Sequence, residues 1–386
     1  MNPIDLPVTI PENAAQIPSP AVLIDVQRVR HNINTSIRLA GPRGVAALRP
    51  HVKTHKLPQV LKMQMERGIR SFKCSTIAEL RMVLEAGVDD VLLAYQPVGP
   101  ALDALIELIQ LYPRASISTL ADNAKTIDQM NTAAREDGVL LQVYLDCNVG
   151  MNRTGIEVMA DGDLEHAAAL YASIHAAPHL QVAGLHAYEG HLRGTDESKL
   201  ITQLQDCMMP MMRLMHALSQ DSLPVPQFIT SGTATSHLMQ LWYHQLPGCE
   251  LLPPLQVGAG TTIFFDAVQY QLCPSLPFQP AATLLTRVVS RPSDQLVCID
   301  LGHKAVASEM PQPRIVLPQV PDARFVKHSE EHLVMETGDA RSLEVGTELI
   351  AIPMHVCPTI ALHRHVYPVV DDVAQAPWRV TPRQPF

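Results

Sequence analysis

The segment Ser71-Phe72-Lys73-Cys74-Ser75-Thr76-Ile77-Ala78-Glu79 joins a short apolar run to the start of a helix. Its first five residues have the length of a buried strand. Thr76 and Glu79 form a capping box, and Gly87 stands where a helix that begins there should end. Another short apolar run follows over Asp90–Gln96. This order of strand, helix and strand predicts a unit of an α/β protein.

The same alternation continues over the first two-thirds of the chain. The strands predicted from apolar runs are Val45–Lys53, Ser71–Ser75, Asp90–Gln96, Ala115–Leu120, Leu140–Asn148, Gln181–Gly190, Gln227–Gly232 and Leu251–Gly260. A further helix is predicted from Asp122 to a stop near Gly138. Eight such alternations are what a (β/α)8 barrel of the TIM type requires, with its active site at the C-terminal strand ends. We therefore predict a barrel over residues 18–267.

After about Ala267 the pattern changes, because β-rich runs punctuated by proline follow one another without helical partners. These runs are Thr283–Ser290, Leu296–Leu301, His332–Glu336 and Glu348–Met354. They predict a separate C-terminal β-domain over residues 268–386. The proline-rich segment 1–17 is expected to pack on that domain.

The composition fits a soluble enzyme. The 386 residues are 47% hydrophobic, which is enough for a large core in more than one domain. Lys and Arg number 29 against 38 Asp and Glu, so the formal net charge of -9 favours neither nucleic acid nor an anionic membrane as a partner. No signal peptide and no membrane span is recognisable, which predicts a cytoplasmic location. The seven cysteines contain no C-x-x-C pair, which argues against a disulfide framework.

A basic cluster ends the first predicted strand. Within Val45–Lys53, the side chains of Arg49, His51 and Lys53 share one parity, so we expect all three to face the barrel mouth. Neighbouring cations lower the pKa of a lysine, and a free amine condenses with an aldehyde cofactor. Lys53 is therefore the candidate for a Schiff-base lysine, and Lys56 in the following loop is less favoured. The alternative is a solvated basic patch.

A candidate metal pair lies in the segment Ile352-Pro353-Met354-His355-Val356-Cys357-Pro358-Thr359. In a strand, His355 and Cys357 would point to the same side and could bind one metal ion. Imidazole with thiolate favours Zn²⁺ or a similar metal, with Mn²⁺ or Co²⁺ as alternatives. With only two protein ligands, the metal ion would keep coordination positions open for catalysis. The alternative is a buried cysteine beside a surface histidine.

Two glycine-containing runs follow the last two predicted barrel strands. They are Ser231-Gly232-Thr233 and Gly258-Ala259-Gly260-Thr261. Many (β/α)8 barrels hold a phosphate group at this position, using exposed backbone N–H groups and small residues. Each run alone is typical of an ordinary turn. Because the two runs follow neighbouring strands at the same end of the barrel, together they predict a phosphate site.

Three motifs together carry a family resemblance. They are Arg49–Lys56, Asn148–Gly155 and His355–Thr359, in this order along the chain. The chain resembles the D-serine dehydratase and D-threonine aldolase family from about Pro18 to about Arg379. Members of this family are pyridoxal 5′-phosphate enzymes with an alanine-racemase-type barrel and a C-terminal β-domain. The resemblance implies that Lys53 forms the Schiff base with the cofactor.

Further cofactor contacts follow from the resemblance. Arg153 is expected beside the phenolic oxygen of the cofactor, and Tyr188 is expected near its pyridine nitrogen. His51 is expected to line the same site. The alternatives are a surface arginine in a glycine-rich loop and a tyrosine packed in the barrel.

The resemblance also bears on the reaction. Dehydratases of the family carry cysteine at the position of Cys357, whereas aldolases carry aspartate there and a histidine where this chain has Gly194. His191 is nearby and is a candidate base. We therefore expect a lyase that dehydrates a β-hydroxy D-amino acid to a 2-oxo acid and ammonia. Aldol cleavage to glycine and an aldehyde is the first alternative, followed by an amino-acid racemase and a non-catalytic pyridoxal-phosphate-binding protein. We expect a homodimer.

Overall fold

The computed structural model describes residues 8–230 and 232–383, which divide into two compact units. The barrel unit consists mainly of Ser36–Lys53 and Leu61–Gly260. The β unit consists of the described residues up to Thr35, Thr54–Val60 and Thr261–Pro382. This division differs from the predicted boundaries at 18 and 267, because the chain enters the β unit twice before its C-terminal part.

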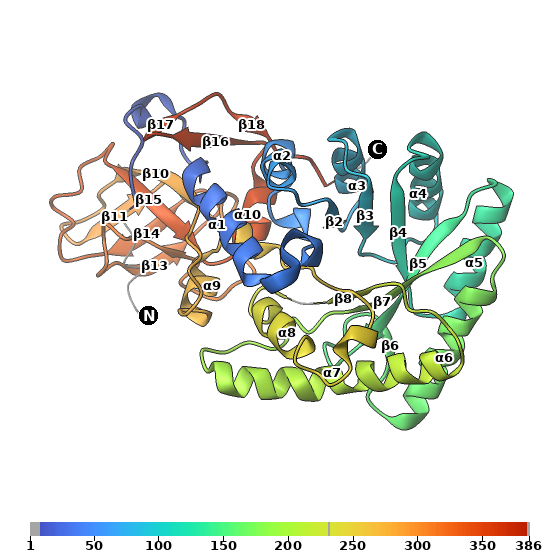
Figure 1. Cartoon of the computed structure of the whole chain (residues 1–386). Helices are drawn as coiled ribbons and strands as arrows, with labels where there is room; N and C mark the ends of the chain where they lie inside the picture. Colours follow the sequence, from blue (N-terminus) through green and yellow to red (C-terminus); the bar gives the residue numbers. More distant parts are fainter. Residues whose placement is uncertain (1–7, 231, 384–386) are drawn as a thin grey trace. The chain divides into compact units, whose positions relative to one another are not determined.

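The barrel unit is built on parallel strands that follow one another in sequence order (Figure 1). These strands are β2 (Ser71–Cys74), β3 (Asp90–Leu93), β4 (Ser116–Ala121), β5 (Leu141–Asn148), β7 (Leu180–Ala187), β8 (Phe228–Thr230) and β9 (Leu255–Val257). A short strand, β6 (Ile156–Glu157), pairs with the end of β5. The predicted parallel α/β architecture is confirmed for all of the expected strand positions except the first.

The first predicted strand, Val45–Lys53, is not a regular strand. Leu48 makes a single parallel bridge with Val257 of β9, and His51 makes another with Lys73 of β2. Pro50 lies between them and has no N–H to continue a ladder. The flanking segments are the 3₁₀ helices η2 (Gly41–Ala47) and η3 (Val52–Thr54). The segment therefore occupies the eighth position of the barrel, between β9 and β2, through two isolated bridges.

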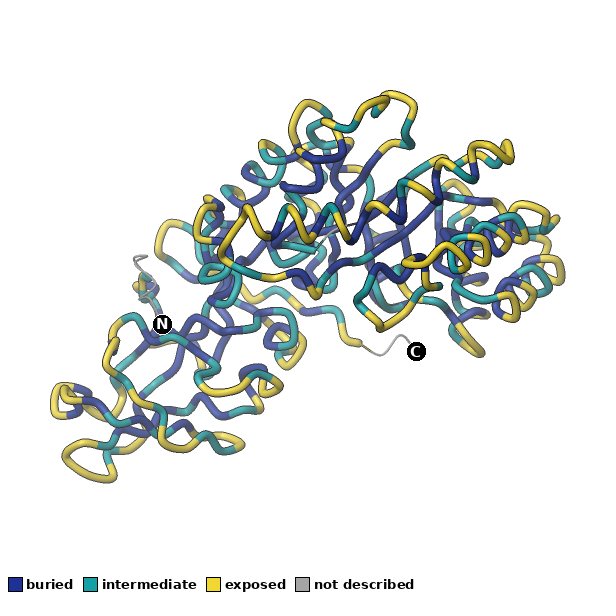
Figure 2. The backbone as a smooth tube through the Cα atoms, turned by 90° about the horizontal axis from the view of Figure 1, so that it is seen from below, coloured by how far each residue is buried: buried dark blue, intermediate teal, exposed yellow. Residues whose placement is uncertain are grey.

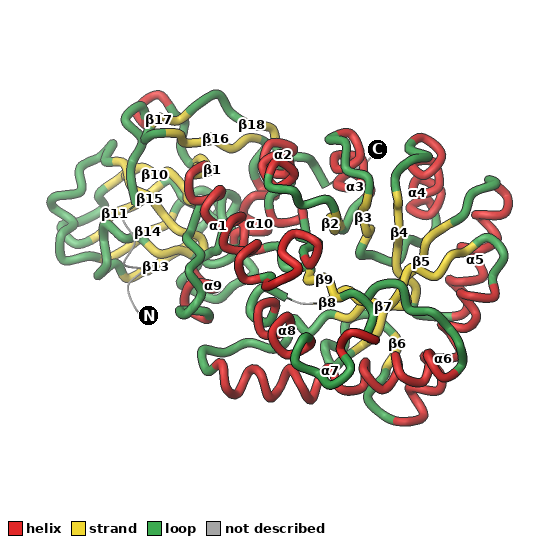
Figure 3. The backbone as a smooth tube through the Cα atoms, viewed as in Figure 1, coloured by secondary structure: helices red, strands yellow, loops and turns green. Residues whose placement is uncertain are grey.

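Helices surround these strands on the outside (Figure 3). They are α3 (Ile77–Glu85), α4 (Pro100–Leu111), α5 (Ala124–Glu136), α6 (Asp161–Ala176), α7 (Glu197–Gln220) and α8 (Ser236–Tyr243), and α2 (Pro58–Glu66) precedes them. Consecutive helices from α3 to α8 contact each other. The predicted start of α3 is confirmed, because Thr76 Oγ1 accepts from Glu79 N at 3.1 Å. Gly87 follows the helix with φ +87°, a value that favours glycine.

The barrel interior contains an apolar layer and, beside it, an ion pair. Leu92, Leu120, Tyr144 and Ile229 pack together inside the barrel. Arg49 was predicted to face the barrel mouth, and this prediction was wrong. Its guanidinium donates to both carboxylate oxygens of Asp90, the first residue of β3, at 2.8 and 2.6 Å. Arg49 therefore points to the opposite end of the barrel, where a carboxylate neutralises its buried charge.

The β unit contains a sheet of ten described strands. The strands are β1 (Ala21–Asp25), β10 (Ala282–Ser290), β11 (Leu296–Ile299), β12 (Ile315–Val316), β13 (Arg324–His328), β14 (Leu333–Glu336), β15 (Glu348–Pro353), β16 (His365–Val370), β17 (Val373–Ala374) and β18 (Trp378–Arg379). Most pairs are antiparallel, but β1 pairs in parallel with β16. The helices of this unit are α1 (Val26–Leu39), which runs on into the barrel unit, α9 (Ala267–Leu272) and α10 (Val356–Leu362).

The chain before β1 lies against the core of the β unit. Val8 and Ile10 pack against buried residues of that core. The guanidinium of Arg287 donates to the carbonyl oxygens of Ala14 and Ile17 at 2.7 and 2.9 Å. In both units most strands are largely buried, and most of the exposed residues lie on helices and loops (Figure 2). The strand β13 is an exception, because its burial pattern is mostly exposed. Among the described residues, no helix is both long enough and apolar enough to span a membrane.

Candidate functional site

Lys53 lies where the closing segment of the barrel leaves the strand position and turns into η3. Its backbone N–H donates to Nδ1 of His51 at 3.3 Å. His51 is buried and is bridged to Lys73 on β2. The structure therefore brings His51 and Lys53 together at the C-terminal end of this segment, as a site at the barrel mouth requires.

Tyr188 directly follows β7 and lies under the side chain of Arg153. The centre of the Arg153 guanidinium is 4.9 Å from the centroid of the Tyr188 ring, which is a cation–π contact. A Cβ atom at Gly190 would lie 2.2 Å from the same ring, so only glycine fits there. The two predicted cofactor contacts thus come together from loops after β5 and β7.

His191 is exposed and lies beside the loop that follows β5. A Cβ atom at Gly150 would be 3.4 Å from Nε2 of His191. The imidazole is therefore near the glycine-rich run that contains Arg153, and its role as a base stays a prediction.

Glu189 organises the first predicted phosphate loop, and sequence reasoning missed it. Its buried carboxylate accepts from Oγ1 of Thr230 at 2.9 Å, from N of Gly232 at 3.2 Å and from Oγ1 of Thr235 at 2.5 Å. The Gly232 N–H is therefore engaged by a carboxylate in this structure. Ser231 lies outside the described residues. A single carboxylate after a strand gives no sequence signal for the three donors that it binds.

The second predicted phosphate run, Gly258–Thr261, divides between the two units. Gly258 lies close to Lys73, because a Cβ atom there would be 2.5 Å from Lys73 Nζ. Thr261 begins the 3₁₀ helix η5 (Thr261–Ile263), and its Oγ1 is 3.6 Å from Sγ of Cys357. The hydroxyl of Thr261 thus lies beside the proposed metal ligand, which the sequence did not indicate. Gly260 is the last residue of this run that belongs to the barrel unit. In the first run, the carbonyl oxygen of Thr233 accepts from Oγ of Ser236 at 3.4 Å.

A buried polar network inside the barrel was also missed. Lys73 Nζ lies 3.4 Å from Nε2 of His186, whose Nδ1 donates to Asp146 at 2.7 Å. Burial, followed by the charge of the nearby Lys53, lowers the pKa of Lys73, which is about 7. Burial also lowers the pKa of His186. Because these residues come from three strands, the sequence spacing alone could not connect them.

The proposed metal pair has a different local structure from the one predicted. β15 ends at Pro353, and His355 is the N-cap of α10, so Cys357 lies in the first turn of a helix rather than in a strand. The prediction of a strand over the pair was wrong, because Asp266 accepts from the N–H of Val356 at 2.9 Å and supports the helix start. The histidine and the thiol still contact each other.

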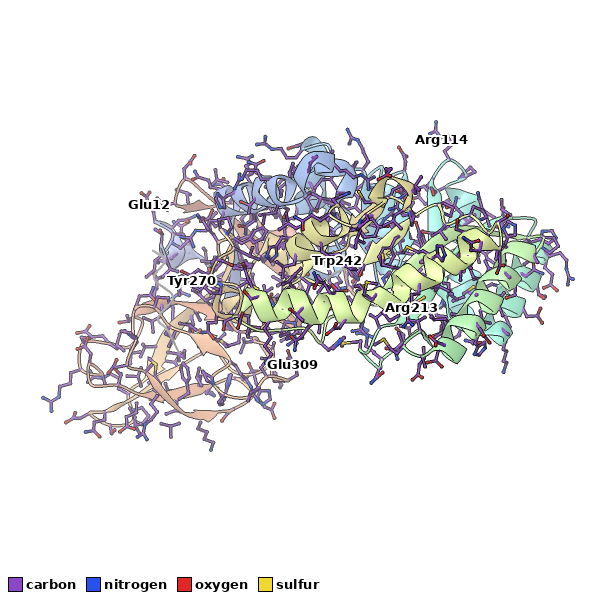
Figure 4. All side chains as sticks on the ribbon, turned by 60° about the horizontal axis from the view of Figure 1, so that its bottom comes forward. Glu12, Arg114, Arg213, Trp242, Tyr270 and Glu309 are labelled. Atoms are coloured by element: carbon purple, nitrogen blue, oxygen red, sulfur yellow. The ribbon has the colours of Figure 1, made fainter. Side chains whose placement is uncertain are left out.

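Polar groups hold both members of the pair in place. Nδ1 of His355 donates to the carboxylate of Glu309, which lies in the chain between β11 and β12. Glu309 is labelled in Figure 4. The thiol of Cys357 donates to Oγ1 of Thr54 at 3.2 Å. Burial lowers the pKa of His355, but the Cys357 thiol and Glu309 outweigh it and raise this pKa to about 9. In the described part of the chain, no cluster of three or more His, Cys, Asp or Glu could hold a metal ion.

These residues fit the groups that the resemblance implies. For a metal, the contact of His355 with Glu309 leaves Nε2 available as a ligand beside the Cys357 thiol, and nitrogen with sulfur suits Zn²⁺. For pyridoxal phosphate, the barrel offers the amine of Lys53 and the cation of Arg153, which lies over the Tyr188 ring that the missing side chain of Gly190 leaves room for. Both sets of residues therefore match the chemistry of their group.

Two family models match parts of this chain. Residues 24–248 match the family model described as alanine racemase, N-terminal domain, and residues 281–369 match the putative serine dehydratase domain. The chain belongs to the alanine racemase N-terminal domain family. Within it, the pairing with a serine dehydratase domain marks a member of the D-serine dehydratase and D-threonine aldolase group of fold-type III pyridoxal-phosphate enzymes.

Individual proteins similar to this family member include lyases of two kinds. A D-threonine aldolase of Arthrobacter sp. is 27% identical over 96% of this chain and 93% of its own length. A D-threo-3-hydroxyaspartate dehydratase of Delftia sp. is 24% identical over 88% of this chain and 91% of its own length. The crystal structure of a D-threonine aldolase from Filomicrobium marinum superposes with a TM-score of 0.85 at 25% identity, covering 98% of both chains.

Proposed function

We propose that this protein is a pyridoxal-phosphate- and metal-dependent lyase that acts on a β-hydroxy D-amino acid, preferably by dehydration. One observation carries the proposal. Thr54, whose hydroxyl accepts from the Cys357 thiol at 3.2 Å, is the residue that follows Lys53 in the chain. Because adjacent Cα atoms are about 3.8 Å apart, the proposed metal ligand contacts the residue that is covalently next to the amine-bearing one.

The residues have complementary roles in this proposal. When bound, the cofactor supplies an electron sink for charge at the substrate Cα, and the metal supplies Lewis acidity at the β-hydroxyl. Lys53 holds the cofactor and then accepts the α-proton of the substrate on Nζ. His355 and Cys357 hold the metal, for which we propose Zn²⁺, with Mn²⁺ or Co²⁺ as alternatives.

The remaining site residues bind and orient the cofactor. Arg153 would lie beside its phenolic oxygen, Tyr188 near its pyridine nitrogen and His51 beside Lys53. Since Gly232 N–H already donates to Glu189, we expect other donors to contribute most of the phosphate binding. The residues proposed for the phosphate are Ser231, Gly232, Thr233, Gly260 and Thr261.

Dehydration is favoured over aldol cleavage by the thiol of Cys357 and by Gly194. In aldol cleavage a base must remove the proton of the β-hydroxyl, and His191 is the candidate for it. The relatives support the class of substrate, because they include aldolases and a dehydratase of β-hydroxy D-amino acids. A racemase or a non-catalytic binding protein would have no use for the metal pair. A homodimer and a cytoplasmic location remain proposals.

Product analysis tests the proposal. The protein, supplied with pyridoxal phosphate and Zn²⁺, would be incubated with D-serine, D-threonine and D-threo-3-hydroxyaspartate, with the L-isomers as controls. Ammonia with a 2-oxo acid from the D-isomers only is the expected result. Formation of glycine and an aldehyde would show that the reaction is aldol cleavage and not dehydration. Interconversion of D- and L-isomers that survives chelation would overturn the lyase assignment.

A further inference from the structure

The buried network of Lys73, His186 and Asp146 crosses the interior of the barrel. Lys73 is on β2 and His186 is on β7, and these strands are not neighbours in the sheet. Their contact at 3.4 Å must therefore pass through the barrel interior. The three side chains are 3 to 5% exposed. A lysine in such a place is costly unless its charge has a function or a partner.

This network lies one layer below the predicted cofactor residues. Tyr188 is two residues beyond His186 along the chain, and Lys53 is two residues beyond His51, which is bridged to Lys73. Both residues lie beyond the positions that carry the network, Tyr188 directly after the C-terminal end of β7 and Lys53 in η3. The network therefore forms the floor on which a cofactor held by Lys53 and Tyr188 would rest.

The amine of Lys73 also lies at the base of both predicted phosphate loops. A Cβ atom at Gly258 would be 2.5 Å from Lys73 Nζ and 3.5 Å from the carbonyl oxygen of Thr230. Thr230 ends β8, and Gly258 follows β9. The two loops start from these residues, so an anion bound by the loops would lie close to the Lys73 amine.

We propose that Lys73 is the charge-compensating residue of the cofactor site, taking up a proton from solvent when the anionic cofactor binds above it. The amine becomes an ammonium group, and the His186–Asp146 pair holds it in position. The proposal rests on the binding of pyridoxal phosphate at Lys53, which is part of the proposed function.

The tautomer of His186 suits this role. Its Nδ1–H donates to Asp146 at 2.7 Å, and burial lowers its pKa, so the ring is neutral and Nε2 carries a lone pair. Nε2 can then accept a hydrogen bond from Lys73 in either protonation state of the amine. The network therefore stays connected when the lysine gains its proton.

The groups around Lys73 set the pKa of its amine close to neutral pH. Burial, followed by the charges of Lys53 and Arg49, lowers its pKa, while Glu189 and Asp146 raise it, and the result is about 7. The titratable and charged groups that face the amine are Lys53, Arg49, Asp146, His186 and Glu189. Additional negative charge nearby favours the ammonium form and raises the pKa of a lysine. Binding of a phosphate dianion should therefore draw a proton onto Lys73.

Calorimetry of cofactor binding tests the proposal. Pyridoxal phosphate would be titrated into the apo protein in buffers of different ionisation enthalpy, and the number of protons taken up would be derived for wild type and Lys73→Met. At about pH 8 we expect wild type to take up about one proton more than the variant, and at about pH 6 we expect almost no difference. Lys125→Met, which changes an exposed lysine on α5, should match wild type.

Separate readouts distinguish the two proposals. Absorbance and borohydride labelling report whether the cofactor is held on Lys53. If both proteins hold it there and take up equal numbers of protons at about pH 8, the role of Lys73 is overturned and the proposed function stands. If wild type does not attach the cofactor to Lys53, the proposed function fails.

A second variant keeps the test decisive if Lys73→Met does not fold, as judged by circular dichroism. Asp146→Asn keeps the lysine but removes a carboxylate that raises its pKa. The proton uptake should then begin at a lower pH than in wild type. An unchanged dependence of proton uptake on pH in Asp146→Asn would count against Lys73 as the proton acceptor.

Discussion

The carboxylate of Glu309 accepts a hydrogen bond from Nδ1 of His355. This contact fixes the imidazole orientation and leaves Nε2 as the nitrogen that can bind a metal. A carboxylate behind a metal-binding histidine also makes the ring a stronger ligand. Glu309 therefore connects a loop of the β unit to the chemistry proposed for His355 and Cys357.

Glu309→Gln should weaken metal binding without removing either ligand. The amide can still accept from Nδ1, but it no longer carries a charge, and the loss in metal affinity should be about 10-fold to 100-fold. Competition with a chromophoric chelator measures this affinity. Glu331→Gln changes an exposed carboxylate in the same way and should bind metal like wild type. Equal affinities for all three proteins would show that Glu309 does not support the metal site.

Cys357→Asp should change both the metal preference and the products. A carboxylate favours harder metals than a thiolate does, so the preference should move from Zn²⁺ towards Mn²⁺ or Mg²⁺. The same change should raise the ratio of aldehyde to 2-oxo acid formed from D-threonine, with Gly194 limiting the gain. Cys357→Ala should lose the metal and most turnover while it keeps the cofactor absorbance. Full activity of the alanine variant after chelation would contradict the metal role.

Asp90→Ala should destabilise the barrel. It would leave the buried guanidinium of Arg49 without its carboxylate partner, which costs about 3 kcal/mol in the free energy of unfolding. Urea denaturation measures this loss. Asp294→Ala breaks an ion pair with Arg341 that is more than three-quarters exposed, and its effect should stay within about 0.5 kcal/mol. Similar losses for the two variants would refute the special role of the buried pair.

His55 should make the protein less stable as the pH falls. Burial lowers the pKa of this histidine to about 3, so below about pH 6.5 the unfolded chain binds a proton that the folded chain does not. Each further pH unit down should remove about 1.4 kcal/mol from the free energy of unfolding. In His55→Asn the amide oxygen can accept from Leu57 N as Nδ1 does, and the slope should become shallower. His166→Asn, on an exposed histidine, should keep the wild-type slope.

Local sequence patterns predicted most of the barrel because strands and helix caps depend on neighbouring residues. The capping box at Thr76 and the strands from Ser71 to Val257 follow from such patterns. The structure around Pro50 could not be predicted in this way. The apolar run there indicates a strand, but it does not show that the missing N–H of Pro50 leaves only two isolated bridges. The helix after His355 was missed for a similar reason. Its start depends on Asp266, which is 90 residues away from Val356 in the chain.

The parts of the site that could not be predicted depend on contacts across the barrel. Lys73 and His186 are 113 residues apart, and no periodicity relates them. Glu189 lies beside the predicted Tyr188, yet its partners Thr230 and Thr235 come from another strand and its loop. The parity of a residue along a strand also does not show towards which end of the barrel a long side chain points. Arg49 is an example, because it points away from the barrel mouth to its ion-pair partner Asp90.

Borohydride reduction followed by peptide mapping tests the central claim most directly. The claim is that Lys53 holds the cofactor, while the nearby Lys73, whose pKa is lowered by burial, remains a separate amine below it. We predict that reduction of the purified protein with bound pyridoxal phosphate labels the peptide that contains Lys53 and leaves Lys73 unmodified. Label on Lys73, or on Lys56 or Lys304, would contradict this assignment.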